Sequence, residues 1–164
     1  MTTYRGIPAR LDLASFARPV IPGNRGVAWR AAWYVTCALF FQSPLLGLLP
    51  SGLKAALLRA FGARVGRGFV CKPRVTIKSP WFLSVGDSVW IGETVWIDNH
   101  CAVTIGSNAC ISQGVCIFTG NHDWNDPCFA FRCKPIAIGN CVWVTAFQRL
   151  GPGTTVPDGC VVQD

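Results

Sequence analysis

Charged residues are scarce in this chain of 164 residues, because only 14% are Asp, Glu, Lys or Arg whereas 51% are hydrophobic. This balance excludes an intrinsically disordered protein, which combines low hydrophobicity with high net charge. Acids are almost missing from residues 1–86, where Asp12 stands alone against twelve basic residues; from Asp87 onward, seven acids face three. Such asymmetry argues against a nucleic-acid binder and predicts one surface that meets something anionic, such as a phosphorylated ligand or membrane headgroups.

Metal ligands are sparse as well. His100 and His122 are the only histidines, and the nine cysteines form no CxxC pair, so no metal site is predicted. The first thirteen residues lack the uninterrupted apolar core of a signal peptide. We therefore expect a reduced, cytoplasmic protein whose cysteines mostly serve as small buried hydrophobic residues. No arrangement around a cysteine favours a thiol nucleophile.

The chain does have a six-residue rhythm, in which an aliphatic residue opens each hexad and a small one often follows. The hexads begin at Val65, Cys71, Ile77, Val85, Ile91, Ile97, Ile105, Ile111, Ile117, Ile138, Val144, Leu150 and Val156. Two extra residues separate successive groups of three, which gives a larger period of twenty residues. The pattern predicts an all-β solenoid, a triangular prism with three short parallel strands per coil and the first and fifth hexad positions inside. An ordinary sandwich is the alternative, and so many hexads in register argue against it.

The hexads divide the chain into parts of one structural unit. Residues 1–62 are predicted to form an N-terminal extension and helical cap, and residues 63–164 the solenoid. A loop over residues 123–137 interrupts the rhythm after His122 and is predicted to reach outward as a lid or an arm. A catalytic group suits such a junction between a rigid and a mobile element.

Residues 27–49 are strongly apolar and carry no charge from Ala31 to Leu49. We favour a helical cap under the first coil, with a second helix at about 51–62. Contact with anionic lipids is a second hypothesis, since basic residues lie nearby at Lys54, Arg59, Arg64, Arg67, Lys72, Arg74 and Lys78. A membrane span is a third, because the stretch is long enough, although Pro44 and Gly47 interrupt it.

The hexads, together with residues 11–13, 53–66, 89–127 and 134–147, resemble the left-handed parallel β-helix (hexapeptide-repeat) acyltransferases. Within that family the NHDW sequence at residues 121–124 is similar to the colanic-acid-type branch of sugar O-acetyltransferases. The resemblance implies a homotrimer that uses acetyl-CoA as donor substrate and no metal. It also implies a saccharide acceptor, lipid-linked forms included, in exopolysaccharide or surface-polysaccharide biosynthesis. Peripheral contact with the inner face of the membrane would then be useful.

The proposed chemistry needs a base, because a sugar hydroxyl is a poor nucleophile toward a thioester. A histidine, with an unperturbed pKa of about 6.5, can accept the hydroxyl proton in the transition state. The resemblance assigns that role to His122, with direct attack on the thioester; a histidine that only caps a turn is the alternative. The candidates for orienting His122 or binding substrate are Asp98, Asn99, Asp123, Trp124 and Asp126. The sequence does not choose among them.

Trp90, Trp96 and Trp143 close their hexads and should point outward. We expect Trp90 and Trp96 at a subunit interface, because apolar patches seldom stay exposed. The run WVTAF resembles the family segment that lines the coenzyme A channel, which makes Trp143 and Ala146 candidate cofactor-binding residues. His100 is expected to be a surface or interface residue, since two histidines at this spacing do not match the β-helical carbonic anhydrases.

The chain stops at Asp164, whereas family members usually continue with further hexads and a Gly-Asn-Pro segment that helps to hold coenzyme A. We therefore expect either a truncated sequence or a weakened coenzyme site. This departure motivates a rival hypothesis, a non-catalytic β-helix that serves as an assembly or membrane-surface scaffold.

Overall fold

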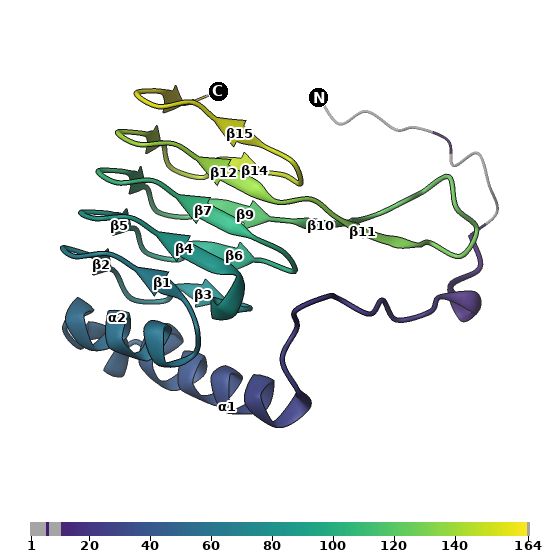
Figure 1. The fold of residues 1–164 in the computed structure, drawn as a ribbon, viewed down its shortest axis with the longest axis horizontal. Coiled ribbons are helices and arrows are strands. Elements are labelled where there is room, and N and C mark those ends of the chain that lie inside the picture. The colour runs from purple at the N-terminus through teal and green to yellow at the C-terminus, as the bar shows by residue number, and fades with distance from the viewer. Residues whose placement is uncertain (1–5, 7–10, 164) are drawn as a thin grey trace.

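The computed structural model describes residue 6 and residues 11–163, so part of the predicted N-terminal extension and Asp164 lie outside the described residues. It shows a parallel β-solenoid with helices beneath its first coil and one arm at its side (Figure 1). The predicted all-β solenoid with a helical cap is confirmed.

Three parallel sheets form the walls. The first contains β1 (Arg64–Val65), β4 (Leu83–Val85), β7 (Val103–Ile105), β12 (Ile136–Ile138) and β15 (Thr155–Val156). The second contains β2 (Val70–Cys71), β5 (Trp90–Ile91), β8 (Cys110–Ile111), β13 (Trp143–Val144) and β16 (Val161–Val162). The third contains β3 (Thr76–Ile77), β6 (Trp96–Asp98), β9 (Cys116–Phe118) and β14 (Arg149–Leu150). Arg64 pairs with Ser84 and Ser84 with Thr104, which confirms the twenty-residue coil.

The interior is built from the two hexad positions that the sequence places inside. Ile97 and Ile111 open their hexads, Val95 and Val115 hold the fifth position, and all four are fully buried. Burial of such a side chain contributes about 1.5–3 kcal/mol. Stacked coils therefore share one continuous core.

A hydrogen-bonded ladder runs up one corner through the third hexad position. The N–H of Arg67 donates to Asp87 Oδ1 (2.7 Å), and that of Asp87 to Ser107 Oγ (3.0 Å). The N–H of Ser107 donates to Asn140 Oδ1 (2.9 Å), and that of Asn140 to Asp158 Oδ1 (2.7 Å). These N–H bonds hold the pKa of the Asp87 and Asp158 carboxyls below the ordinary value. Short polar side chains at this position thus join each coil to the next.

The cap consists of α1 (Val27–Cys37), a π-helical turn (Ala38–Gln42), a 3-10 turn (Leu46–Leu48) and α2 (Ser51–Ala60). Trp33 is buried and its Nε1 donates to the carbonyl oxygen of Ile77 (2.7 Å), which attaches α1 to the first coil. No helix in the described part of the chain is long and apolar enough to cross a membrane.

Lys54 does not belong to the exposed basic surface that the sequence suggests. It is 1% exposed, and its Nζ donates to the carbonyl oxygens of Gly47 (2.6 Å) and Cys71 (2.8 Å). Burial lowers the pKa of this amine. The side chain donates hydrogen bonds to backbone carbonyl groups where the cap meets the first coil, and so it holds the cap to the solenoid.

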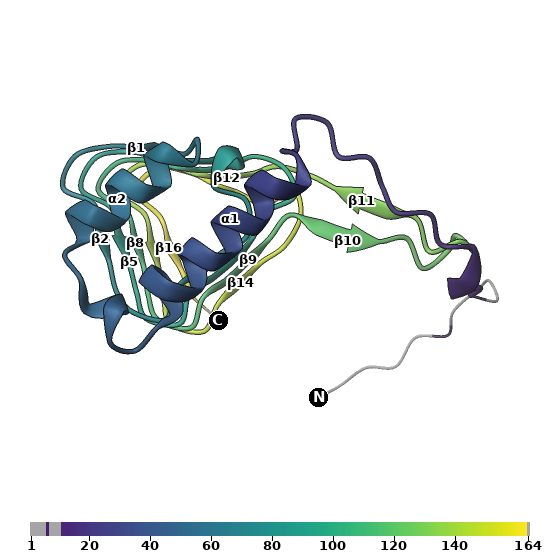
Figure 2. The ribbon, with the colours of Figure 1, turned by 90° about the horizontal axis from the view of Figure 1, so that it is seen from below.

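The arm differs from the loop predicted over residues 123–137. Its strands β10 (Gly120–His122) and β11 (Phe131–Cys133) pair antiparallel, so the chain leaves the wall three residues earlier than expected. It also returns earlier, because Ile136 already pairs with Val103 in the first wall. The N-terminal segment, with a 3-10 turn at Leu13–Ser15, runs alongside this arm (Figure 2). The N–H of Asp12 donates to the carbonyl oxygen of Pro127 (2.9 Å), which holds the two together near the tip.

Candidate active site

His122 lies on the arm, and three phenylalanine rings surround its imidazole. The ring of Phe129 stacks on it with centroids 4.1 Å apart and planes 5° from parallel. Phe131 and Phe16 meet it edge-on, each at 5.4 Å. Because Phe16 comes from the N-terminal segment, the pocket around His122 combines two distant parts of the chain.

The hydrogen bond of His122 determines which nitrogen can act as a base. Its Nδ1 lies 2.7 Å from the carbonyl oxygen of Phe129. A carbonyl oxygen can only accept, so we assign the hydrogen of the neutral ring to Nδ1, which donates it. The lone pair is then on Nε2, where a general base needs it.

Asp98 and Asn99 do not contact the His122 ring, whose Nδ1 faces the backbone carbonyl of Phe129, so their roles stay predictions. Asn99 is fully buried; its Oδ1 accepts from the N–H of Ser79 (2.9 Å) and its Nδ2 donates to the Ser79 carbonyl (2.7 Å). Asp98 Oδ1 lies 2.7 Å from Lys78 Nζ. Both side chains are occupied in joining the first two coils.

Asp123 and Asp126 are also engaged elsewhere. Asp123 pairs with Arg132 across the arm (2.6 Å), and Asp126 Oδ1 accepts from the N–H of Cys128 (2.9 Å). Both carboxyl groups thus make contacts within the arm, and an orienting role for them stays a prediction. Trp124 lies beside them with its ring half-exposed. A substrate-binding role for these residues stays a prediction.

His100 lies nearer to the site than a surface residue would. Its Nε2 is 3.0 Å from Lys78 Nζ and 3.4 Å from Asp98 Oδ1, and its ring meets Phe131 edge-on at 4.8 Å. Burial and the Lys78 charge lower the pKa of His100, against the effect of Asp98. The Phe131 ring thus lies against both His100 and His122.

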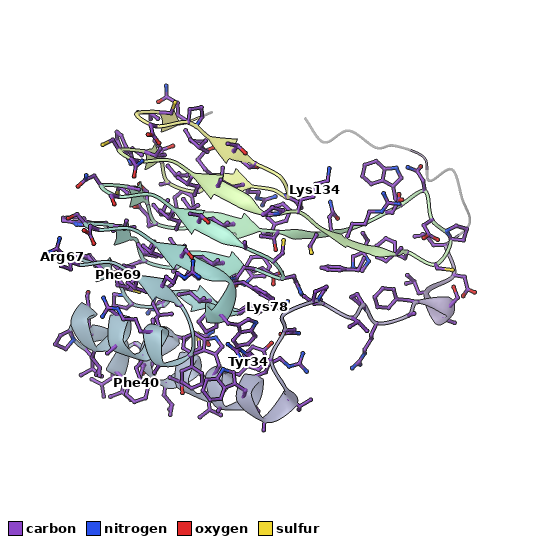
Figure 3. The ribbon with its side chains drawn as sticks, viewed as in Figure 1. Tyr34, Phe40, Arg67, Phe69, Lys78 and Lys134 are labelled. Atoms are coloured by element: carbon purple, nitrogen blue, oxygen red, sulfur yellow. The ribbon has the colours of Figure 1, made fainter. Side chains whose placement is uncertain are left out.

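Two hollows share Asn121, the residue before His122. A cavity of about 390 Å³ on the arm is lined by Asn121, His122, Asp123, Trp124, Asn125, Arg132, Lys134 and Pro152. A groove of about 750 Å³ on the third wall is lined by Trp96, Asp98, Gly114, Cys116, Phe118, Gly120, Asn121, Phe147 and Arg149. Asn121 borders both hollows. Figure 3 shows Lys134 near the base of the arm and Lys78 in a lower coil.

The outward tryptophans lie on two of the three walls. Trp90 and Trp143 lie on the second wall on either side of Cys110, whereas Trp96 lies on the third wall. Trp143 is 51% exposed and donates from Nε1 to Ser112 Oγ (2.9 Å). Ala146 is partly buried, and its neighbour Phe147, rather than Ala146, lines the third-wall groove. Coenzyme binding by Trp143 and Ala146 stays a prediction.

No group of three or more potential metal ligands is gathered among residue 6 and residues 11–163. The site therefore consists of an oriented imidazole, aromatic rings and two adjoining hollows.

No family model matches the sequence. A relative from Escherichia coli (strain K12), named "Putative colanic acid biosynthesis acetyltransferase WcaF", is 35% identical over 152 residues, which cover 92% of this chain and 82% of the relative. This chain belongs to the hexapeptide-repeat acetyltransferases, in the colanic-acid-type branch. It is an acetyltransferase.

Other members of the family agree with this placement. The galactoside O-acetyltransferase of Escherichia coli (strain K12) is 27% identical over 122 residues, which cover 66% of this chain and 55% of that protein. The crystal structure of the hexapeptide-repeat acetyltransferase VCA0836 of Vibrio cholerae superimposes with a TM-score of 0.68 at 22% identity, covering 84% of this chain and 80% of that one. A second VCA0836 structure, complexed with acetyl coenzyme A, gives a TM-score of 0.61 at 21% identity, covering 82% and 69%.

Sequence analysis of this acetyltransferase missed the residues that surround His122. Phe129 has a positive φ of 53°, which an isolated sequence does not reveal. Phe16 lies more than a hundred residues away along the chain. Phe131 lies in β11, but Phe129 precedes that strand in a left-handed conformation, so strand alternation does not relate the two rings.

Proposed function

We propose that this acetyltransferase moves an acetyl group from acetyl-CoA to a saccharide hydroxyl, in exopolysaccharide or surface-polysaccharide biosynthesis, with His122 as general base. The observation that carries the proposal is the Nδ1 bond to the Phe129 carbonyl, which leaves Nε2 able to accept a proton. The name of the WcaF relative supports the biosynthetic setting, and the acetyl-CoA complex of VCA0836 supports the donor.

The reaction needs no covalent enzyme intermediate. The sugar oxygen attacks the thioester carbonyl carbon while Nε2 of His122 takes the hydroxyl proton. The Phe129 carbonyl stabilises the resulting imidazolium, since it accepts from Nδ1 throughout. Collapse of the tetrahedral intermediate breaks the carbon–sulfur bond, and the imidazolium returns the proton to the thiolate. The products are the sugar ester and free coenzyme A.

The two hollows suit the two substrates. The arm cavity offers the half-exposed ring of Trp124 for stacking and the polar side chains of Asn125 and Lys134 for sugar hydroxyls. The third-wall groove is larger and offers Trp96 and Phe147 to an extended acyl carrier. Asn121 borders both, so the hydroxyl and the thioester would meet beside His122.

The proposal includes a homotrimer. Trp90, Trp96 and Trp143 are 56%, 45% and 51% exposed, and rings of this size seldom stay in water. A threefold assembly would cover them and enclose the open grooves. Sedimentation analysis tests this point: a monomer that transfers acetyl groups at micromolar concentration would contradict an active site shared between subunits.

The proposal also includes a lipid-linked form of the acceptor and work at the cytoplasmic face of a membrane. A chain that meets its acceptor there needs a surface that binds lipid, and the helical cap is the candidate.

The decisive experiment measures thiol release from acetyl-CoA with candidate saccharides. His122→Ala should lower the rate by about 10²–10⁴-fold, the usual contribution of a general base. His100→Ala is the matched control, because it removes the other imidazole and leaves the Phe129 bond intact. Full activity of the His122 variant, or a loss confined to the His100 variant, would overturn the assignment.

Calorimetry with coenzyme A separates the enzyme from the scaffold alternative. Binding at micromolar to millimolar ligand is expected for the enzyme. If coenzyme A does not bind at millimolar concentration, the scaffold hypothesis is favoured and the proposed reaction fails.

A further inference from the structure

The outer face of the helical cap is strongly apolar. Large hydrophobic side chains are exposed on the cap at Val27, Trp29, Val35, Leu39, Leu45, Leu46, Leu48 and Leu53. Leu45 and Leu48 are 76% and 71% exposed, respectively. We call this set of eight residues the cap face. On an ordinary protein surface, exposed hydrophobic residues are scattered singly, whereas here they are concentrated on one group of helices and turns.

The cap face lies on the free end of the molecule. The helices α1 and α2 cross the open end of the prism in one layer, and among the described residues nothing lies beyond them (Figure 2). The inner side of the cap carries the buried Trp33 of α1, Phe41 of the π-helical turn and Leu58 of α2. Tyr34 and Phe40 appear on this layer in Figure 3. The cap therefore has apolar residues on two sides. The inner side is covered by the first coil, and the outer side is not covered by any described residue.

Positive charge borders the cap face. Exposed basic residues without an ion pair in the described chain lie on the cap or the first coil at Arg25, Arg64, Lys72 and Arg74. Arg59 is exposed as well, but it donates to the carbonyl oxygens of Val65 and Gly66. No acid occurs between Leu13 and Gly86. An apolar helical face with basic neighbours and no acids is the composition of helices that lie in the headgroup region of anionic membranes.

We propose that the cap face docks on an anionic lipid bilayer, with α1 lying in the interface and the basic residues contacting lipid phosphates. A second copy of the chain is the competing occupant. Face-to-face pairing would bring two acid-free, basic surfaces together, and that repulsion favours the lipid. The docking goes beyond the proposed reaction, because it requires neither acetyl-CoA nor acceptor.

Docking in this way sets the height of the site. His122 extends from the third coil, and the arm runs across the solenoid axis rather than along it (Figure 1). Strands about 4.8 Å apart place the third coil about 10 Å above the first. A helix of about 10 Å diameter then puts His122 roughly 20 Å from the lipid, within reach of a saccharide on a membrane anchor.

Flotation of the purified chain with lipid vesicles tests the proposal. Vesicles containing phosphatidylglycerol should carry the protein to the top of the gradient, and pure phosphatidylcholine vesicles should carry much less. Leu45→Glu with Leu48→Glu should lower binding at least about tenfold, since the apolar contact is lost. Lys72→Gln should lower it about fivefold, the usual contribution of one basic residue at an anionic surface. Val20→Glu, at a more exposed apolar site outside the cap face, is the control and should change little.

Each variant is expected to fold, because all the substituted side chains are exposed. Circular dichroism checks this expectation. Binding that is equal for the original chain and the Leu45/Leu48 variant would overturn the proposal, as would no preference for anionic lipid. Absence of vesicle binding together with a concentration-dependent dimer that the same variant abolishes would assign the cap face to a second copy and also overturn it. None of these readouts involves acetyl transfer, so they fail independently of the proposed function.

Discussion

The solenoid and the arm adjoin each other in the chain, but different contacts stabilise them. In the solenoid each strand pairs with a strand of a neighbouring coil, and most strands bury an aliphatic side chain such as Ile97 or Ile111. In the arm one antiparallel pair of three residues is held by aromatic rings, and none of residues 120–135 is buried. The solenoid is thus stabilised by packing of its core, and the arm by one strand pair and by contacts between partly exposed aromatic rings.

This difference separates stability from chemistry. Elements with few buried contacts open at low free energy without global unfolding. His122 lies on such an element, while the walls beneath it keep their shape. Changes in the arm should therefore affect activity, and changes in the coils should affect stability.

The largest effect expected from this comparison is at His122. Replacement by alanine should lower acetyl transfer by about 10²–10⁴-fold and leave the thermal unfolding transition almost unchanged. Differential scanning calorimetry beside the activity assay checks both halves. A large fall in transition temperature would show that the arm supports the fold after all.

The second effect is in the core. Ile111→Ala should reduce the free energy of unfolding by about 2–5 kcal/mol, because a fully buried side chain leaves a cavity. Trp124→Ala in the arm is the matched control and should change stability by less than about 0.5 kcal/mol. Urea unfolding measures both, and similar losses would remove the distinction between the regions.

The same substitution, glycine to alanine, can be made once in the solenoid and once in the arm to compare the two regions. A Cβ at Gly139 would lie 2.7 Å from the backbone nitrogen of Asp158, so Gly139→Ala should cost about 1–3 kcal/mol of stability. A Cβ at Gly120 would lie 2.5 Å from the Phe131 ring, which can move. Gly120→Ala should spare stability and lower acetyl transfer about tenfold or more, because this ring packs on His122. The reverse pattern in the two assays would contradict this explanation.

The smallest effect concerns the corner ladder and pH. The pKa of Asp87 and Asp158 is lower in the folded chain, so their contribution is present above the unfolded pKa of about 3.9 and is lost as pH falls through the folded value. The transition temperature should therefore fall between about pH 5 and pH 2. Asp87→Asn with Asp158→Asn should flatten that decline, and an unchanged slope would assign the acid sensitivity to other groups.

Much of the solenoid was predictable because its rules are local and repeated. A residue such as Ile111 points inward wherever a hexad opens, and the helix near Ser51–Ala60 follows from an apolar run before the first coil. His122 was recognisable from the motif and the break in rhythm. Its surroundings were not, since the Asp and Asn candidates turned out to bind Ser79, Lys78, Arg132 and Cys128 instead.

By itself, the sequence determined the six-residue repeat, the positions that point inward and the histidine at which the repeat is interrupted. These features depend on the spacing and size of side chains that are near neighbours in the chain or occupy equivalent positions in successive coils. Only the tertiary structure decided that the interruption is a hairpin, that the Phe129 carbonyl selects the tautomer of His122, and that Phe16 closes its pocket. Each of these depends on the register of β10 with β11 and on an N-terminal segment that crosses the arm. Such contacts join residues far apart in the chain, where no local period relates one to the other.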